Sequence, residues 1–241
     1  MKGVNKNSPD QLALAGTTLL INGIVGSRAY GLDNDASDTD TLAVYAEEPT
    51  FFLGLQNPDA GSLTRVTHVV DGDDSAAHEV SKFLRLALKA NPTCSELLWL
   101  PEYLDISPAG DELVAMRGEL LSAGAVRSAY LGYCQGQVSR LRRTLKEKEG
   151  RHVMRLALQA AALWKTGELQ VRVSDPQRCF DFGRLVMAEP QLAADLVDRL
   201  ADTLTGPSPL PAQPNRDRVE AWLLNFRREQ FRRLLADPAG A

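Results

Sequence analysis

The sequence lacks any long apolar run. No stretch of its 241 residues reaches about 18 uncharged apolar residues, the length that a membrane-spanning helix needs. The opening residues, MKGVNKNSPDQ, are polar and do not contain the apolar core of a signal peptide. These two absences argue against a membrane partner, and we expect a cytoplasmic protein.

Cysteine and histidine are scarce, with three of each. The cysteines are odd in number and far apart, at Cys94, Cys134 and Cys179. They form neither a CxxC pair nor a zinc-binding spacing, and the histidines form no HExxH or HxxxH pattern. A disulfide framework and the common zinc sites are therefore excluded, and we expect reduced thiols.

An excess of positive charge is also lacking, because the net charge is −4. A protein built to coat a polyanion would be basic overall. The charge is uneven, with a net −6 over residues 1–100 and a net +2 over residues 101–241. An acidic first part joined to a mildly basic second part indicates two regions with different tasks.

Short apolar, β-branched stretches in the first hundred residues predict strands. We expect strands over 17–25, 39–45, 63–70 and 74–78, a helix over 79–90 and a short helix over 93–100. Strands followed by helices are typical of an α+β fold. The first of two predicted domains, residues 1–105, therefore holds a small mixed sheet.

The second predicted domain, residues 106–241, has helical spacing of its apolar residues almost throughout. We expect helices over 110–122, 125–149, 152–166 and 190–204. A Pro-rich linker, 206–214, precedes a last amphipathic helix over 216–236. The aromatic residues of that last helix favour docking onto the rest of the protein over nucleic-acid binding.

Carboxylates are concentrated between residues 33 and 40. Asp38 and Asp40 stand two apart at the start of a predicted strand, so both side chains should project to one face. Two like charges this close are unfavourable unless a cation lies between them. Oxygen ligands favour Mg²⁺ or Mn²⁺, which typically bind together with substrate phosphates. Asp33 and Asp35 are interpreted as turn-capping residues.

A Gly26-Ser27 turn follows the first predicted strand and precedes a short predicted helix that includes Arg28. Glycine allows close approach to the backbone, and the Ser27 hydroxyl can donate to a phosphate. The turn and the two acids together predict a site that holds a triphosphate at both ends. A DxD pair alone occurs in many loops, and the alternative is a solvated acidic loop.

Two long segments, GSRAYGLDNDASDTDTLAVY (26–45) and HEVSKFLRLALKANPTCSELLWLP (78–101), resemble a family of predicted nucleotidyltransferases. This is the RNA repair pathway polymerase β family, a branch of the DNA polymerase β superfamily. SRLRRTLKEKEGRHVMRLALQAAALWKTGEL (139–169) resembles its helical segment, so the resemblance covers roughly residues 20–185. It implies a palm-like domain that transfers a nucleoside monophosphate from an NTP, such as ATP, to an acceptor hydroxyl by a two-metal mechanism.

The resemblance implies a third acid on a neighbouring strand. The candidates are Asp71, Asp73, Asp74 and Glu79, and alignment of the following helix favours Asp74. Metal ligands would then be Asp38, Asp40 and Asp74. Glu79 is the second choice, with stabilisation of a first helical turn as its alternative role. Residues 69–78 could also be an acidic hairpin turn.

Lys148, His152 and Arg155 have the i, i+4, i+7 spacing of one helix face and match residue types of the resembling family. The resemblance implies that they bind nucleotide together with Gly26, Ser27 and Arg28. The alternative is a solvated basic helix end, with Gly150 breaking the helix and misaligning this face. Residues 139–151 carry a net +4, which suits contact with a nucleic-acid backbone.

Three functions stay open at this point. The favoured one is the nucleotidyltransferase, with an RNA end, a protein hydroxyl or a small molecule as the acceptor. A glycosyltransferase also uses a DxD pair to hold a metal and a nucleotide sugar. A degenerate nucleotidyltransferase fold could serve as a binding or antitoxin-like protein.

Overall fold

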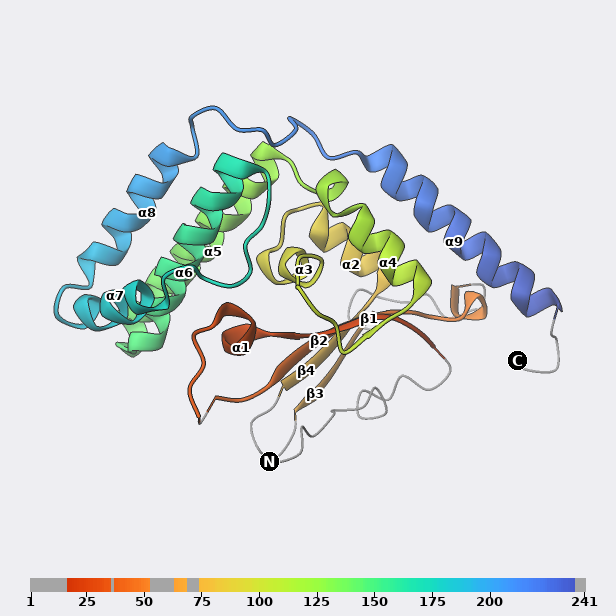
Figure 1. The fold of residues 1–241 in the computed structure, drawn as a ribbon, viewed down its shortest axis with the longest axis horizontal. Coiled ribbons are helices and arrows are strands. Elements are labelled where there is room, and N and C mark those ends of the chain that lie inside the picture. The colour runs from red at the N-terminus through yellow and green to blue at the C-terminus, as the bar shows by residue number, and fades with distance from the viewer. Residues whose placement is uncertain (1–16, 36, 53–62, 69–73, 237–241) are drawn as a thin grey trace.

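The computed structural model describes residues 17–35, 37–52, 63–68 and 74–236. In this part of the chain a mixed sheet lies beneath a layer of helices, and a further group of helices extends to one side (Figure 1). The strands come first in the sequence and the long helices follow. The α+β fold expected from the sequence is confirmed.

The sheet has the strand order β3-β4-β2-β1-β5. Its strands are β1 (Thr18–Val25), β2 (Asp40–Ala46), β3 (Thr64–His68), β4 (Asp74–Glu79) and β5 (Asp105–Ile106). β2 runs parallel to β4 and antiparallel to β1, while β3 and β5 are antiparallel edge strands. The first four strands lie where the sequence predicts them, except that positions 69 and 70 fall outside the described residues. β5 was not predicted, because two residues carry no pattern.

Three helices cover the face of the sheet that is uppermost in Figure 1: α2 (Val80–Ala87), α3 (Pro92–Leu97) and α4 (Pro108–Ala115). The predicted helix over 79–90 is shorter, because Glu79 is the N-cap and Ala90 adopts φ 51°. The predicted helix over 110–122 was also wrong in extent. It divides into α4 and a 3₁₀ turn, η3 (Arg117–Leu120).

The helices that extend to one side are α5 (Ala123–Thr144), α6 (Glu147–Thr166), α7 (Pro176–Ala188) and α8 (Gln191–Thr203). The alternative in which Gly150 breaks the helix is wrong. The chain turns instead at Leu145, with φ 46°, and α6 continues through Gly150. There the missing side chain allows α7 to pack closely, since a Cβ on Gly150 would lie 3.1 Å from Cα of Gly183. α7 itself was not predicted.

The Pro-rich stretch over 206–214 has no helix or strand, but it is packed against the helices. Trp164 Nε1 donates to Gly206 O at 3.1 Å, and Ser208 Oγ donates to Trp164 O at 2.7 Å. The stretch leads into α9 (Arg216–Ala236), which has the predicted bounds and packs against η3 and η2 (Pro49–Phe52) (Figure 1). The amphipathic face of α9 therefore serves for docking, as expected.

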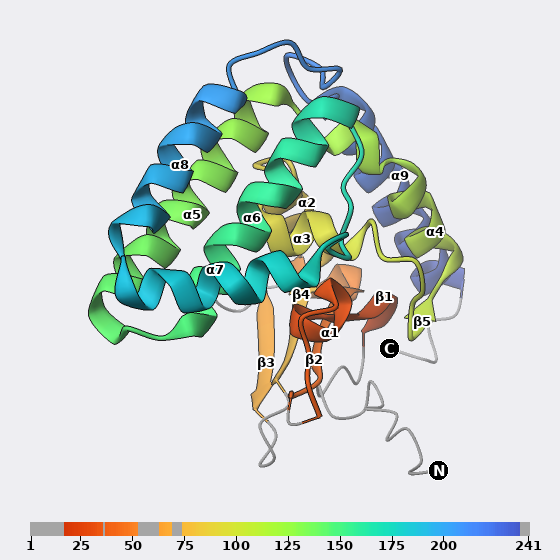
Figure 2. The same cartoon turned by 60° about the vertical axis from the view of Figure 1, so that its left-hand side comes forward.

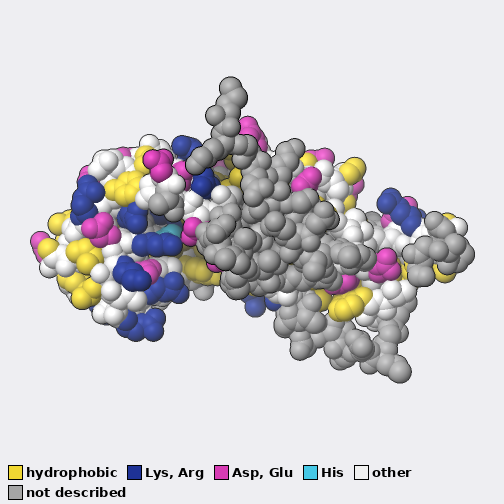
Figure 3. Space-filling model, turned by 90° about the horizontal axis from the view of Figure 1, so that it is seen from below, with side chains coloured by type: hydrophobic (Ala, Val, Ile, Leu, Met, Phe, Trp, Pro, Cys, Tyr) yellow, Lys and Arg dark blue, Asp and Glu magenta, His cyan; other side chains and the backbone are white. Residues whose placement is uncertain are grey.

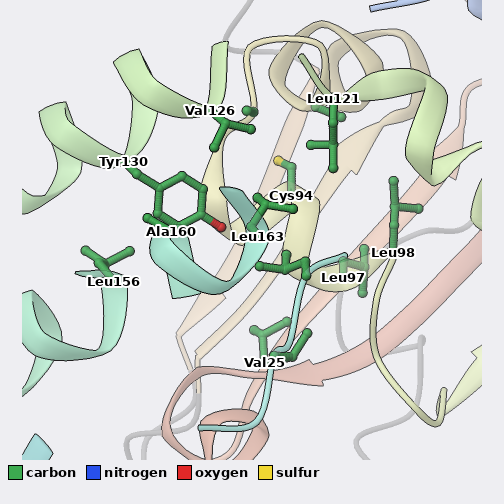
Figure 4. Close-up of a cluster of buried hydrophobic side chains, with 14 of the residues drawn as sticks. Val25, Cys94, Leu97, Leu98, Leu121, Val126, Tyr130, Leu156, Ala160 and Leu163 are labelled. Atoms are coloured by element: carbon green, nitrogen blue, oxygen red, sulfur yellow. The ribbon is translucent and has the colours of Figure 1, made fainter. Parts of the chain in front are cut away.

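One buried core joins the sheet to the helices. Val25 of β1 and Cys94 and Leu97 of α3 lie in the same cluster as Val126 of α5 and Leu163 of α6 (Figure 4). All three cysteines are buried and free, as expected. The boundary at residues 105 and 106 stays a prediction, because the apolar core is continuous across it. Of the described helices, none is long and apolar enough to cross a membrane.

Candidate active site

A cavity of about 460 Å³ lies between the sheet and the first half of α6. Six of the predicted site residues line it: Ser27, Asp38, Asp40, Asp74, Lys148 and His152. Five further residues line it that were not predicted: Tyr30, Leu32, Asn34, Ser37 and Arg151. The carboxylates and the cationic groups therefore occupy two walls of one cavity, which we call the acid wall and the cation wall.

The acid wall is built by the register of two parallel strands. Thr41 of β2 pairs with Ser75 of β4, and their hydroxyl oxygens lie 2.8 Å apart. Asp40 and Asp74 each precede this pair by one residue, so they start neighbouring strands at the same edge of the sheet. Asp74, the residue that the resemblance favours as the third acid, therefore lies beside Asp40 at this edge.

Asp38 lies in the loop before β2, and Arg28 holds this loop in place. Arg28 Nη2 donates to Ser37 O at 2.6 Å, and its Nε donates to Asp38 O at 3.2 Å. Asn34 contributes as well, since its backbone N–H donates to Ser37 Oγ at 2.8 Å. Arg28, a predicted nucleotide-binding residue, is not among the residues that line the cavity. Its side chain instead holds the backbone of Ser37 and Asp38 in place.

Gly26 provides the space in which the Asp40 carboxylate lies. It begins the one-turn helix α1 (Gly26–Tyr30) and adopts φ 73°, a conformation that favours glycine. A Cβ built on Gly26 would overlap the Asp40 carboxylate. The Gly-Ser turn and the strand acid are therefore in direct contact, and Ser27 faces the cavity next to them.

The cation wall comes from the first turns of α6, where Lys148, Arg151 and His152 line the cavity. Burial, followed by the charges of Arg155, Lys148, Arg151 and Arg140, lowers the pKa of His152 to about 3. The imidazole is therefore neutral at physiological pH and can accept a hydrogen bond. Sequence reasoning missed Arg151, although its i+3 spacing from Lys148 was a usable signal.

Arg155 lies deeper than the cavity and is 6% exposed. Its Nη1 is 2.5 Å from Glu96 Oε1 and 2.7 Å from Gln159 Oε1, and its guanidinium lies over the Tyr30 ring. Arg155 does not line the cavity, contrary to the role implied by the resemblance. Lys148, His152 and Arg155 do lie on one continuous helix, α6, but Arg155 is buried in the core.

Glu79 is also engaged elsewhere. It is fully buried, accepts a hydrogen bond from the Ser81 backbone at 2.7 Å and forms an ion pair with Arg227 of α9. Its alternative role, stabilisation of the first turn of a helix, agrees with this position. The other candidates for the third acid, Asp71 and Asp73, lie outside the described residues.

The acid wall has the donor chemistry for Mg²⁺ or Mn²⁺. Within the described ranges, no three His, Cys, Asp or Glu side chains form a complete metal site by themselves. Mg²⁺, however, typically takes one or two carboxylates plus substrate phosphates and water. Asp40 and Asp74 at the starts of two strands, with Asp38 in the loop before β2 and a turn without a side chain at Gly26, fit a cation that is shared with a nucleotide.

A small mixed sheet with carboxylates at one edge, a Gly-Ser turn beside them and a following helical region define a polymerase β-like nucleotidyltransferase. The chain matches the model of the RNA repair pathway DNA polymerase beta family over residues 10–223 and belongs to that family. No curated protein matches it. Membership implies nucleotidyltransferase activity in general, and enzymes of this kind generally use divalent metals.

Proposed function

We propose that the protein is a Mg²⁺- or Mn²⁺-dependent nucleotidyltransferase that moves a nucleoside monophosphate from an NTP to an acceptor hydroxyl. The observation that carries the proposal is the shared cavity, which has three carboxylates on one wall and Lys148, Arg151 and His152 on the other. A nucleotide triphosphate with its metal needs both: oxygen ligands for the cation and positive groups for the remaining phosphate charge.

In the proposed reaction the acceptor oxygen attacks the α-phosphorus in line, and the bond from that phosphorus to the leaving pyrophosphate breaks. A bound divalent cation would supply Lewis-acid activation of the phosphate and of the acceptor hydroxyl. Asp38, Asp40 and Asp74 would hold the cation with the triphosphate, and Asp74 would also accept the proton of the acceptor hydroxyl. Ser27 donates to a phosphate oxygen, while Lys148 and Arg151 neutralise charge on the leaving pyrophosphate.

We propose an RNA end as the acceptor. Arg140, Arg142, Arg143 and Lys146 are all exposed where α5 ends and α6 begins, and we call them the basic corner. They lie next in sequence to Lys148 and Arg151 of the cation wall, and Lys and Arg side chains gather on this part of the molecule in Figure 3. If the end of an RNA strand enters the cavity, the phosphates of its backbone can contact the basic corner.

The test is incubation of the protein with each α-labelled NTP, Mg²⁺ or Mn²⁺, and cell extract that is then separated into RNA, protein and small molecules. We expect label in the RNA fraction. The isosteric changes Asp38→Asn and Asp40→Asn should each remove it. Asp33→Asn and Asp35→Asn are matched controls, because both residues are exposed in the same loop and do not line the cavity.

The alternatives give different results in the same experiment. Label in the protein or small-molecule fraction would replace RNA as the acceptor and keep the enzyme class. No transfer from any NTP, together with Mn²⁺ affinity that the Asp38 and Asp40 changes leave unaltered, would favour the degenerate binding protein. Glycosyl transfer from a nucleotide sugar would favour the glycosyltransferase, although the family match argues against it.

A further inference from the structure

A buried polar cluster lies directly behind the cavity. Tyr30 Oη donates to Glu96 Oε2 at 2.7 Å, and the other oxygen of Glu96 is 2.5 Å from Arg155 Nη1. Arg155 Nη1 also donates to Gln159 Oε1 at 2.7 Å, and its guanidinium lies 3.9 Å from the centre of the Tyr30 ring. We call these four residues the buried bridge.

The buried bridge joins elements from both walls of the cavity. Tyr30 ends α1, three residues after Ser27, and lines the cavity itself. Arg155 lies on α6, one helical turn after Arg151. Gln159 Nε2 donates to Val171 O at 2.9 Å, and Val173 N donates to Tyr30 O at 3.0 Å. The segment between α6 and α7 is thereby tied to both α6 and α1 (Figure 2).

Stability alone does not favour such a cluster. All four side chains are buried, and removing charges from water costs more than a pair usually recovers, so apolar residues of similar volume would often do as well. Among the described residues no group accepts from Nε of Arg155, so the cluster is not fully satisfied either. What directional, short hydrogen bonds do provide is one defined geometry.

We propose that the buried bridge fixes the distance between α1 and α6, so that Ser27 on α1 and Lys148 on α6 can contact the same triphosphate. Glu96 and Arg155 are then positioning residues, which act through α1 and α6 without touching the nucleotide. The inference rests on the proposed function. It gives Arg155 a role that differs from the nucleotide contact implied by its place in the sequence.

The test measures coupling between the two walls. The double change Glu96→Gln/Arg155→Met removes both charges together, so that neither is left buried and unpaired. Affinity for a non-hydrolysable ATP analogue with Mn²⁺ is measured by calorimetry with and without Lys148→Met. In the native background we expect Lys148→Met to weaken binding by roughly tenfold or more, as for loss of a charged hydrogen bond. In the double-variant background this effect should shrink to within about threefold.

Affinity for Mn²⁺ alone is the internal control, since its three proposed ligands lie on the acid wall, and it should stay unchanged in the double variant. Gln159→Met is a milder second variant that removes the hydrogen bonds to Arg155, Gln170 and Val171, and it should reduce the coupling in the same direction. A merely structural bridge would lower the thermal midpoint but leave the full effect of Lys148→Met. That result, or a parallel loss of Mn²⁺ affinity, would overturn the inference. Absence of any metal-dependent nucleotide binding in the native protein would instead reject the proposed function.

Discussion

His152 carries no charge in a cavity wall that is otherwise cationic. Burial lowers the pKa of its ring, and the charges of Arg155, Lys148, Arg151 and Arg140 lower it further. A protonated imidazole would add a further positive charge to this wall. The neutral ring instead offers an acceptor nitrogen beside two donors, which suits a hydroxyl or a sugar better than a phosphate oxygen.

The pH dependence of stability should report this environment. The pKa of His152 is about 3 in the folded protein and about 6.5 in the unfolded chain. At any pH between these two values, His152 takes up a proton when the protein unfolds. The unfolded state therefore gains stability as pH falls below about 6.5, and at pH 5 the cost to folding is at most roughly 2 kcal/mol. Urea unfolding of the native protein and His152→Asn at pH 7.5 and pH 5 measures it. An equal pH dependence in both proteins would contradict the prediction.

Gly26 should tolerate no side chain. Gly26→Ala places a Cβ where the Asp40 carboxylate lies and requires alanine at φ 73°. We expect a loss of unfolding free energy of about 1 kcal/mol or more, with weaker Mn²⁺ binding because Asp40 is displaced. Calorimetric titration with Mn²⁺ measures the second effect.

Gly132→Ala is the matched control for Gly26→Ala. It lies within α5, where no atom beyond the adjacent helix backbone would approach the new Cβ within 4 Å. This change should leave Mn²⁺ binding unaltered and stabilise the helix by up to about 1 kcal/mol. If both glycine variants bind Mn²⁺ like the native protein, Gly26 does not position Asp40.

An ion pair joins α9 to the sheet. Arg227 pairs with the fully buried Glu79, donates to Glu47 O at 3.2 Å and lies over the ring of Phe52. Glu79 also caps α2, so a single carboxylate joins the last residue of β4, the helix that follows it and the C-terminal helix. This explains why an acid so close to the site contributes nothing to the cavity.

Arg227→Met should destabilise the protein strongly, because it leaves Glu79 buried without its cation. The expected loss of unfolding free energy is about 3 kcal/mol, measured by urea unfolding. Arg228→Met on the same helix is the control and should change stability by less than about 0.5 kcal/mol, since Arg228 is exposed. Equal effects of the two changes would show that the ion pair is not what holds α9.

At the scale of the whole molecule, the acid wall faces the cation wall across the cavity, and the exposed basic corner adjoins the cation wall in the sequence. The net charge of −4 disfavours a long nucleic-acid footprint, whereas a strand end needs only a few phosphate contacts. If RNA is the acceptor, we therefore expect its affinity to depend modestly on salt concentration, and we expect this dependence to come from the basic corner.

The triple change Arg142→Gln/Arg143→Gln/Lys146→Gln should weaken binding of a single-stranded RNA. It should also lower the slope of log affinity against log salt by about 0.7 for each phosphate that the variant no longer neutralises, measured by fluorescence anisotropy. Arg228→Gln/Arg232→Gln/Arg233→Gln on α9 removes the same charge from another surface and should leave the slope unchanged. Equal effects of the two triple changes would mean that only net charge matters, and the basic corner would have no specific role.

Much of the fold follows from local patterns. β1 and β2 are predicted because apolar, β-branched runs suit buried strands, and the bounds of α9 follow from its amphipathic spacing after a Pro-rich stretch. The alternative in which Gly150 breaks the helix is wrong because glycine in a helix can also mark a close approach of another helix. Here that neighbour is Gly183 of α7, which the local sequence does not reveal.

For the site, the sequence by itself determined the chemistry of the acid wall, since Asp38, Asp40 and the Gly26-Ser27 turn lie within one short stretch whose spacing reflects local geometry. Only the tertiary structure decided the rest. The parallel register of β2 and β4 brings Asp74 beside Asp40, and the packing of α6 exposes Arg151 to the cavity while it buries Arg155. Helical spacing shows which residues share a face but not how deep that face lies, because depth depends on the elements packed against it.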